Sequence, residues 1–208
     1  MARPKREPGV PTARARIEDA FWELLEEMPY KDLTVSALSS RAQVNHNTFY
    51  YHFHSIDDMA KEFVEGSLLT DVPRSMMVAL RGGERSWIDA VASCFVETDD
   101  MELRFHRLCI LLGDPSAHWA VELLQGTMRG LWLEALGVGE KELSPEVRMR
   151  LAFVFGGLMA LLRELPSVSF VEPSADEMVQ RLRAFGESDL GEAVAETLKG
   201  LRAGAAGR

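Results

Sequence analysis

Cysteine and long apolar runs are both scarce in this chain of 208 residues. Its two cysteines, Cys94 and Cys109, are too few for a disulfide framework or a cysteine-rich metal site, and they fit a reducing compartment. The longest apolar run, residues 151–162, is too short for a membrane helix. No apolar segment follows the basic, proline-interrupted N-terminus, so no secretory signal is predicted. We therefore expect a cytoplasmic protein without a membrane span.

Patterns typical of catalysis are missing as well. The sequence has no glycine-rich phosphate loop, no nucleophile elbow and no group of His, Asp and Glu with usable spacing. His106 and His118 could be metal ligands, but no third ligand clusters with the two of them, so no metal site is predicted. Strands and internal repeats are not recognisable either. We expect an all-α protein that is not an enzyme and needs no cofactor.

An excess of positive charge is also absent. The net charge is −9, which argues against non-specific binding to nucleic acid. Residues 1–54 are balanced, with seven basic and seven acidic residues, so the acidity lies in residues 55–208. The first sixteen residues nevertheless form a basic arm, which suits either a phosphate backbone or a solvated terminus. Its charged residues are Arg3, Lys5, Arg6, Glu7, Arg14 and Arg16.

Apolar residues then recur with the period of an amphipathic helix over residues 16–28. Pro29 ends this helix, because the residue before a proline avoids helical geometry. Glu26 and Glu27 near its end oppose the helix dipole, a local conflict that the sequence does not explain. The positions on the apolar face are Ile17, Ala20, Phe21, Leu24, Leu25 and Met28.

Two short helices joined by a tight turn follow. Thr34 and Asn45 are good caps for the first and the second of them. If Phe49 points inward, a rotation of 100° per residue places Asn47 and Tyr51 on the opposite face. A face of amide and hydroxyl groups without negative charge suits a groove walled by phosphates.

Residues 33–53, with the helix before them, resemble the DNA-binding domain of the TetR family of transcriptional regulators. The shared pattern is Thr-Val at 34–35, Ala-x-Val at 42–44 and Thr-Phe-Tyr-x-His-Phe at 48–53. Two positions depart from the family. Gln43 replaces a frequent glycine in the turn, where a left-handed backbone costs more with a side chain. Ile56 replaces a frequent lysine, so one phosphate contact is expected to be missing.

The resemblance and the predicted exposure together assign roles in DNA binding. His46, Asn47 and Tyr51 are expected to read base edges, and the amide of Asn47 matches adenine. Residues 48, 50 and 52 are expected to bind phosphate, as the matching positions of the family commonly do. The complete set of predicted DNA-binding residues is Thr34, Arg41, Asn45, His46, Asn47, Thr48, Tyr50, Tyr51 and His52.

The remainder is predicted to be a larger helical domain, residues 55–208, that follows a DNA-binding domain at residues 1–54. A capping pattern at Ser55 starts a linking helix over residues 55–70. Apolar periodicity and breakers predict further helices over residues 84–98, 101–112, 116–136, 145–165 and 174–203, with a loop at 166–173.

The resemblance implies a homodimer. One helix-turn-helix domain, called the reading head below, offers few contacts with DNA, and two of them can read a pseudo-palindromic operator in double-stranded DNA. It also implies that the last two helical regions form the dimer interface. Small residues every four positions, which let two helix backbones approach closely, are compatible with this. The predicted interface residues are Ala152, Gly156, Ala160, Met178 and Leu182.

A cavity for a small-molecule effector is a further implication of the resemblance. Bulky residues with a few polar groups lie between positions 95 and 132, although a plain helical core has the same composition. The candidate residues are Phe95, Phe105, His106, Cys109, His118, Trp119, Met128 and Trp132. The resulting hypothesis is a transcriptional repressor released from DNA by a ligand. The alternative is a small-molecule or protein-binding helical module whose head has lost DNA binding.

Overall fold

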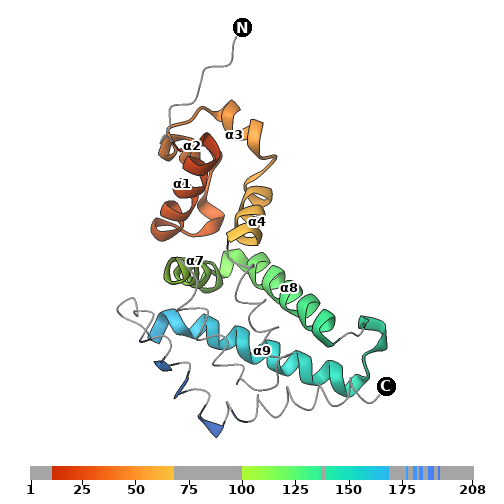
Figure 1. The fold of residues 1–208 in the computed structure, drawn as a ribbon. Coiled ribbons are helices and arrows are strands. Elements are labelled where there is room, and N and C mark those ends of the chain that lie inside the picture. Colours follow the sequence, from red (N-terminus) through yellow and green to blue (C-terminus); the bar gives the residue numbers. More distant parts are fainter. Residues whose placement is uncertain are drawn as a thin grey trace. The chain divides into compact units, whose positions relative to one another are not determined.

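The computed structural model describes residues 11–67, 100–136 and 139–168 and, beyond these, residues 177, 180, 181, 183, 184, 187–189 and 192. Every regular element in these stretches is a helix, which confirms the predicted all-α class (Figure 1). Contacts divide the chain into two compact units, Met1–Phe63 and Val64–Arg208. The division lies inside the helix α4 (Ile56–Ser67), so most of α4 belongs to the first unit, whereas the sequence led us to begin the second domain at residue 55.

The first unit begins with α1 (Ala13–Glu27). This helix starts three residues before the predicted position because the Thr12 hydroxyl accepts a hydrogen bond from the backbone N–H of Ala15 at 3.0 Å. The apolar face predicted from the sequence is buried, except for Met28, which is half-buried. Trp22 is buried as well, which the periodicity did not predict. The buried residues of α1 are Ile17, Ala20, Phe21, Trp22, Leu24 and Leu25.

A short 3₁₀ helix, η1 (Tyr30–Asp32), leads to α2 (Val35–Arg41) and α3 (His46–His52). Both predicted caps are confirmed. The Thr34 hydroxyl accepts from the N–H of Ala37 at 3.1 Å, and the Asn45 side chain accepts from the N–H of Thr48 at 2.7 Å. Each cap satisfies a backbone donor that the first turn of a helix leaves free.

Aromatic rings join α1, α3 and α4 in the core of the first unit. The centroid of the Phe63 ring lies 5.8 Å from that of Phe21 and 5.3 Å from that of Phe53. Phe49 is completely buried and packs on Phe53 at 5.7 Å. Edge and tilted contacts of this kind add to the stabilisation from apolar burial. The three helices therefore share one aromatic core.

The start of α4 is also held by polar groups. The Ser55 hydroxyl accepts from the N–H of Asp58 at 3.0 Å, which confirms the predicted cap. The Tyr30 hydroxyl, on η1, donates to the Asp57 carboxylate at 2.5 Å. Burial and this hydrogen bond to a negative group raise the pKa of Tyr30, so the phenol stays protonated. The predicted end of α4 at residue 70 lies outside the described residues.

Among the described residues of the second unit, three longer helices pack on one another (Figure 1). The break expected between the helices at residues 101–112 and 116–136 is a turn, in which the Asp114 side chain accepts from the N–H of Ser116 at 2.8 Å. No helix in the described stretches is long and apolar enough to cross a membrane. The elements are α7 (Met101–Gly113), η2 (Pro115–Ala117), α8 (His118–Leu136), η3 (Glu140–Glu142) and α9 (Pro145–Val168).

The end of α9 corrects one prediction. The sequence suggested a helix to residue 165 and a loop from Pro166, but α9 continues through Pro166 to Val168. Proline has no backbone N–H, so a helix that contains it lacks one hydrogen bond. A helix can accommodate this loss in its final turn but rarely extends much beyond the proline. The helix predicted at residues 84–98 lies outside the described residues. The region 174–203 is described only at the separate positions given above.

Candidate nucleic-acid interface

The turn between α2 and α3 has the hydrogen bonding of a Schellman motif. The N–H of Val44 donates to the carbonyl of Ser39 at 2.9 Å, and the N–H of Gln43 donates to the carbonyl of Ser40 at 3.2 Å. Gln43 has a φ of 53°, in the left-handed region that favours glycine. The turn thus keeps a geometry that glycine reaches more easily, at a conformational cost of about 1 kcal/mol.

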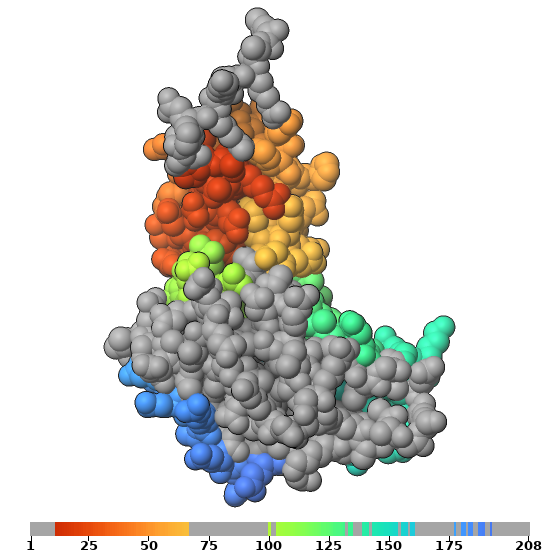
Figure 2. Space-filling view, viewed as in Figure 1, coloured from red at the N-terminus to blue at the C-terminus, as the bar shows by residue number. Residues whose placement is uncertain are grey.

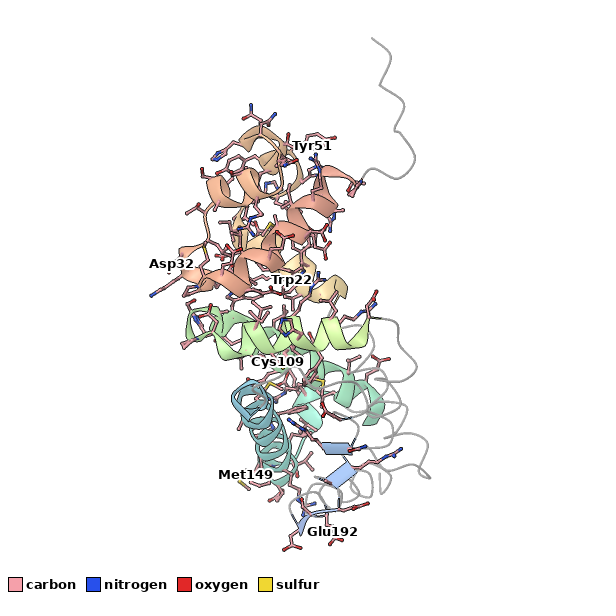
Figure 3. All side chains as sticks on the ribbon, turned by 90° about the vertical axis from the view of Figure 1, so that its left-hand side faces the viewer. Trp22, Asp32, Tyr51, Cys109, Met149 and Glu192 are labelled. Atoms are coloured by element: carbon pink, nitrogen blue, oxygen red, sulfur yellow. The ribbon has the colours of Figure 1, made fainter. Side chains whose placement is uncertain are left out.

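The side chain of Phe49 sets the rotation of α3 about its axis. Because Phe49 is fully buried, the residues on the opposite face of the helix point to solvent. Tyr51 is 79% exposed and Tyr50 is 55% exposed. His46 and Asn47 are also exposed. Figure 2 shows α3, in orange, at the surface of the first unit, and Figure 3 labels Tyr51 near the top of this unit.

Two of the predicted DNA contacts are engaged with each other. The Oδ1 atom of Asn45 accepts from the Thr48 backbone N–H and also from the Thr48 hydroxyl, at 2.9 Å. Thr48 is half-buried, and its hydroxyl proton is used inside the protein. A phosphate oxygen can only accept a hydrogen bond, so Thr48 would have to break this bond before it could donate to DNA. Asn45 keeps its NH₂ group available.

Arg41, another predicted contact, forms ion pairs with two carboxylates of α1. Its guanidinium lies 2.7 Å from the Glu27 carboxylate and 3.2 Å from that of Glu23. The hydrogen bond from Arg41 is the main reason why the pKa of Glu27 is lowered, and it raises the pKa of Arg41 in turn. This pairing explains why an acidic residue is tolerated at the end of α1. The other predicted residues, Thr34 and His52, are exposed and half-buried respectively.

The candidate effector residues lie in different environments of the second unit. Cys109 on α7 and Met128 on α8 are buried, and burial raises the pKa of the Cys109 thiol to about 12. His118 is exposed at the start of α8. Three others are half-buried: Phe105, His106 and Trp119. Phe95 and the side chain of Trp132 lie outside the described residues. In the stretches that are described, no group of His, Cys, Asp and Glu is arranged to hold a metal ion.

One face of α9 is apolar and exposed. The buried face carries Leu151, Phe155 and Met159. The exposed face includes Met149, at 66%, and Phe153, at 64%, and Figure 3 shows Met149 on the outer side of the helix. The predicted interface residues Ala152, Gly156 and Ala160 are exposed too, whereas Met178 and Leu182 lie outside the described residues. The interface prediction from the sequence did not include Met149 and Phe153. Their spacing could have indicated them, because residues 149, 153, 156 and 160 lie at i, i+4, i+7 and i+11 on one helix face.

The first unit therefore has the geometry of a helix-turn-helix DNA-binding domain. Residues 17–63 match the profile of the bacterial regulatory proteins of the tetR family, a stretch that runs from α1 into α4. This match identifies the first unit as a tetR-type DNA-binding domain and confirms the resemblance seen in the sequence. No curated protein matches the chain.

Substitutions of Gln43 test the left-handed turn. Gln43→Val should lower the free energy of unfolding of the first unit by about 1–2 kcal/mol, because a β-branched residue is strained at positive φ. Gln43→Gly, the matched control, should leave stability equal or higher, since it relieves the strain and removes no described side-chain contact. Urea unfolding followed by circular dichroism measures both variants. Equal stability of the two variants would contradict the left-handed assignment.

Proposed function

We propose that this protein is a homodimeric transcriptional repressor that acts in the cytoplasm. It reads a pseudo-palindromic operator through α3 and leaves the DNA when a small molecule binds its second unit. The observation that carries the proposal is the outward face of α3, held in place by the buried Phe49 within a helix-turn-helix unit of the tetR family. In this account the DNA-reading domain is residues 1–54, and residues 55–70 link it to the ligand-binding and dimerisation domain.

Base reading is assigned to three exposed side chains, His46, Asn47 and Tyr51. The Asn47 amide offers a donor and an acceptor, the pair that adenine presents in the major groove. Tyr51, which is 79% exposed, can contact base edges or a thymine methyl group. Tyr50 and His52 flank the reading face and are assigned to phosphate. Thr48 and Arg41 contribute less in this account, because intramolecular bonds already engage them.

Dimerisation is assigned to the exposed apolar face of α9. Apolar patches of this kind mark interaction surfaces, since a monomer gains by removing them from water. Small residues at positions 152, 156 and 160 lie along the same face as Met149 and Phe153. Two copies related by a two-fold axis can bring these faces together, because the same patch then serves both partners. Met178 and Leu182 are proposed to add to the interface.

Ligand release requires that the effector bind one state of the dimer better than the other. Coupling of this kind typically amounts to about 1–3 kcal/mol, or 5- to 150-fold in operator affinity. The candidate residues on α7 and α8 combine apolar surface with a few polar groups, as ligand cavities do. A ligand that binds tightly and leaves operator affinity unchanged would contradict this part of the proposal.

The DNA-reading role is tested by selecting an operator from a randomised duplex library with the purified protein. Asn47→Ala should then weaken operator binding by about 1–3 kcal/mol and relax the preference at one base position. Ser40→Ala is the matched control. Ser40 is an exposed polar residue of α2 outside the predicted DNA-binding set, so this variant should keep both the fold and the base preference. Fluorescence anisotropy on operator and single-base variants measures the change.

If the library yields no enriched site, the reading head is degenerate. The protein is then better described as a small-molecule or protein-binding module, in keeping with its acidic charge and with the departures at Gln43 and Ile56. If an operator is found but Asn47→Ala binds it like the wild type, the assignment of base reading to Asn47 is wrong.

The dimer interface is tested with Gly156→Glu. An added Cβ at Gly156 meets nothing within 4 Å, so the subunit should still fold. A carboxylate in the middle of an apolar interface would be buried without a partner, which should convert the dimer to monomers in analytical ultracentrifugation. Gly126→Glu on α8 is the matched control, because its Cβ also meets nothing within 4 Å, and it should stay dimeric. A Gly156→Glu protein that stays dimeric, or a monomeric wild type, would contradict the assignment.

A further inference from the structure

The first turn of α1 carries two arginines and no acidic residue. Positive charge at the N-terminus of a helix is opposed by the helix dipole, so Arg14 and Arg16 do not favour the helix in which they lie. In the sequence they count among the basic residues of the N-terminal arm, which suits either a DNA backbone or a solvated terminus. Their contacts in the structure point elsewhere.

Arg16 contacts the turn that precedes α3. Its Nη1 atom donates to the backbone carbonyl of Gln43 at 3.2 Å, and Gln43 is the residue whose left-handed conformation reverses the chain. The Nε atom of Arg16 is buried and has no hydrogen-bond partner among the described residues. The guanidinium is therefore folded back onto the reading head, with one of its nitrogen atoms closed off from solvent.

Arg14 contacts the other end of α3. Its guanidinium carbon lies 5.4 Å from the centroid of the Phe53 ring and 5.8 Å from that of Phe63, within the range of cation–π attraction. It also forms an ion pair of 2.6 Å with Glu62 of α4. Phe53 is the C-cap of α3, and its N–H donates to the carbonyl of Phe49. Arg14 thus joins the end of α3 to α4.

We propose that Arg14 and Arg16 are positioning residues that hold the two ends of the recognition helix, and that they are not phosphate ligands. The inference rests on the proposed reading role of α3. A helix of seven residues has little stability of its own, so its placement depends on the packing of Phe49 and on contacts at its ends. Base contacts require heavy-atom distances of about 2.7–3.2 Å, so a small tilt of α3 weakens base reading more than it weakens general attraction to DNA.

An open cavity of about 190 Å³ lies beside the Arg16–Gln43 contact. It is lined by Arg16, Asp19, Ala20, Glu23, Arg41, Ala42 and Gln43. Because this space is open, water can replace the guanidinium and hydrogen-bond to the Gln43 carbonyl when Arg16 is substituted. The first unit of the Arg16→Gln variant should therefore still fold, so a change in its DNA affinity would not result from unfolding.

The test compares Arg16→Gln with the wild type on the selected operator and on a scrambled duplex, over a salt series. A positioning residue should lower operator affinity about fivefold, leave scrambled-duplex affinity unchanged and keep the slope of log K against log salt. A phosphate ligand should lower both affinities and reduce that slope by about 0.9. Lys61→Gln is the control for loss of one charge, because Lys61 is exposed on α4 and makes no described contact.

A smaller salt slope for Arg16→Gln than for Lys61→Gln would overturn the proposal, and so would an unchanged ratio of operator to scrambled affinity. The second outcome includes a variant that has a lower melting temperature but the wild-type ratio of operator to scrambled-duplex affinity. Such a variant would show that Arg16 contributes only to stability. If the wild type itself does not discriminate, the proposed function fails and the positioning role fails with it. Wild-type discrimination combined with either overturning result refutes the positioning role alone.

Glu62→Gln tests Arg14 through the sign of its effect. The substitution frees the Arg14 guanidinium from its carboxylate and leaves Arg14 itself in place. If Arg14 positions α3, operator binding should be no tighter than in the wild type. If Arg14 binds phosphate, its release should tighten binding to both duplexes and steepen the salt slope. Tighter, more salt-dependent binding would therefore overturn the assignment for Arg14.

Discussion

The burial of Phe49 is the constraint on which the reading head depends. Its ring is enclosed by the aromatic core that joins α1, α3 and α4, and this fixes the rotation of α3 about its own axis. Asn47 and Tyr51 lie on the face of the helix opposite Phe49, so they point to solvent when Phe49 is buried. A seven-residue helix becomes a defined reading surface through this one packing contact and the contacts at its ends.

Charged groups in the first unit serve largely to hold helices together. Arg41 links the end of α2 to α1, and the bonded Tyr30–Asp57 pair links η1 to α4. The exposed ion pairs are individually weak because water and salt screen them, so their contribution is to orientation more than to stability. The first unit holds eight basic and ten acidic residues, and several of its cations are paired. Fewer cations are therefore available for DNA than its composition suggests, which places more of the recognition on the neutral face of α3.

Interactions between residues close in sequence were predictable, and those between distant residues were not. The caps at Thr34, Asn45 and Ser55 each span three residues, so the sequence pattern alone indicates them. The contact from Arg16 to the Gln43 carbonyl spans 27 residues, and no periodicity predicts it. In the second unit, the sequence alone does not distinguish Cys109 from His118 as cavity-lining residues, because a core and a cavity have the same composition. In the structure Cys109 is buried and His118 is exposed.

The central claim is that the outward face of α3 contacts bases, and the side-chain amide of Asn47 reports on it most directly. The chain has two asparagines, and the Oδ1 atom of Asn45 is already bonded to Thr48. We would follow both NH₂ groups by NMR during titration with the operator and with a scrambled duplex. The account predicts a large shift of the Asn47 signals with the operator and a small one with the scrambled duplex. Unchanged Asn47 signals in a protein saturated with operator would contradict it.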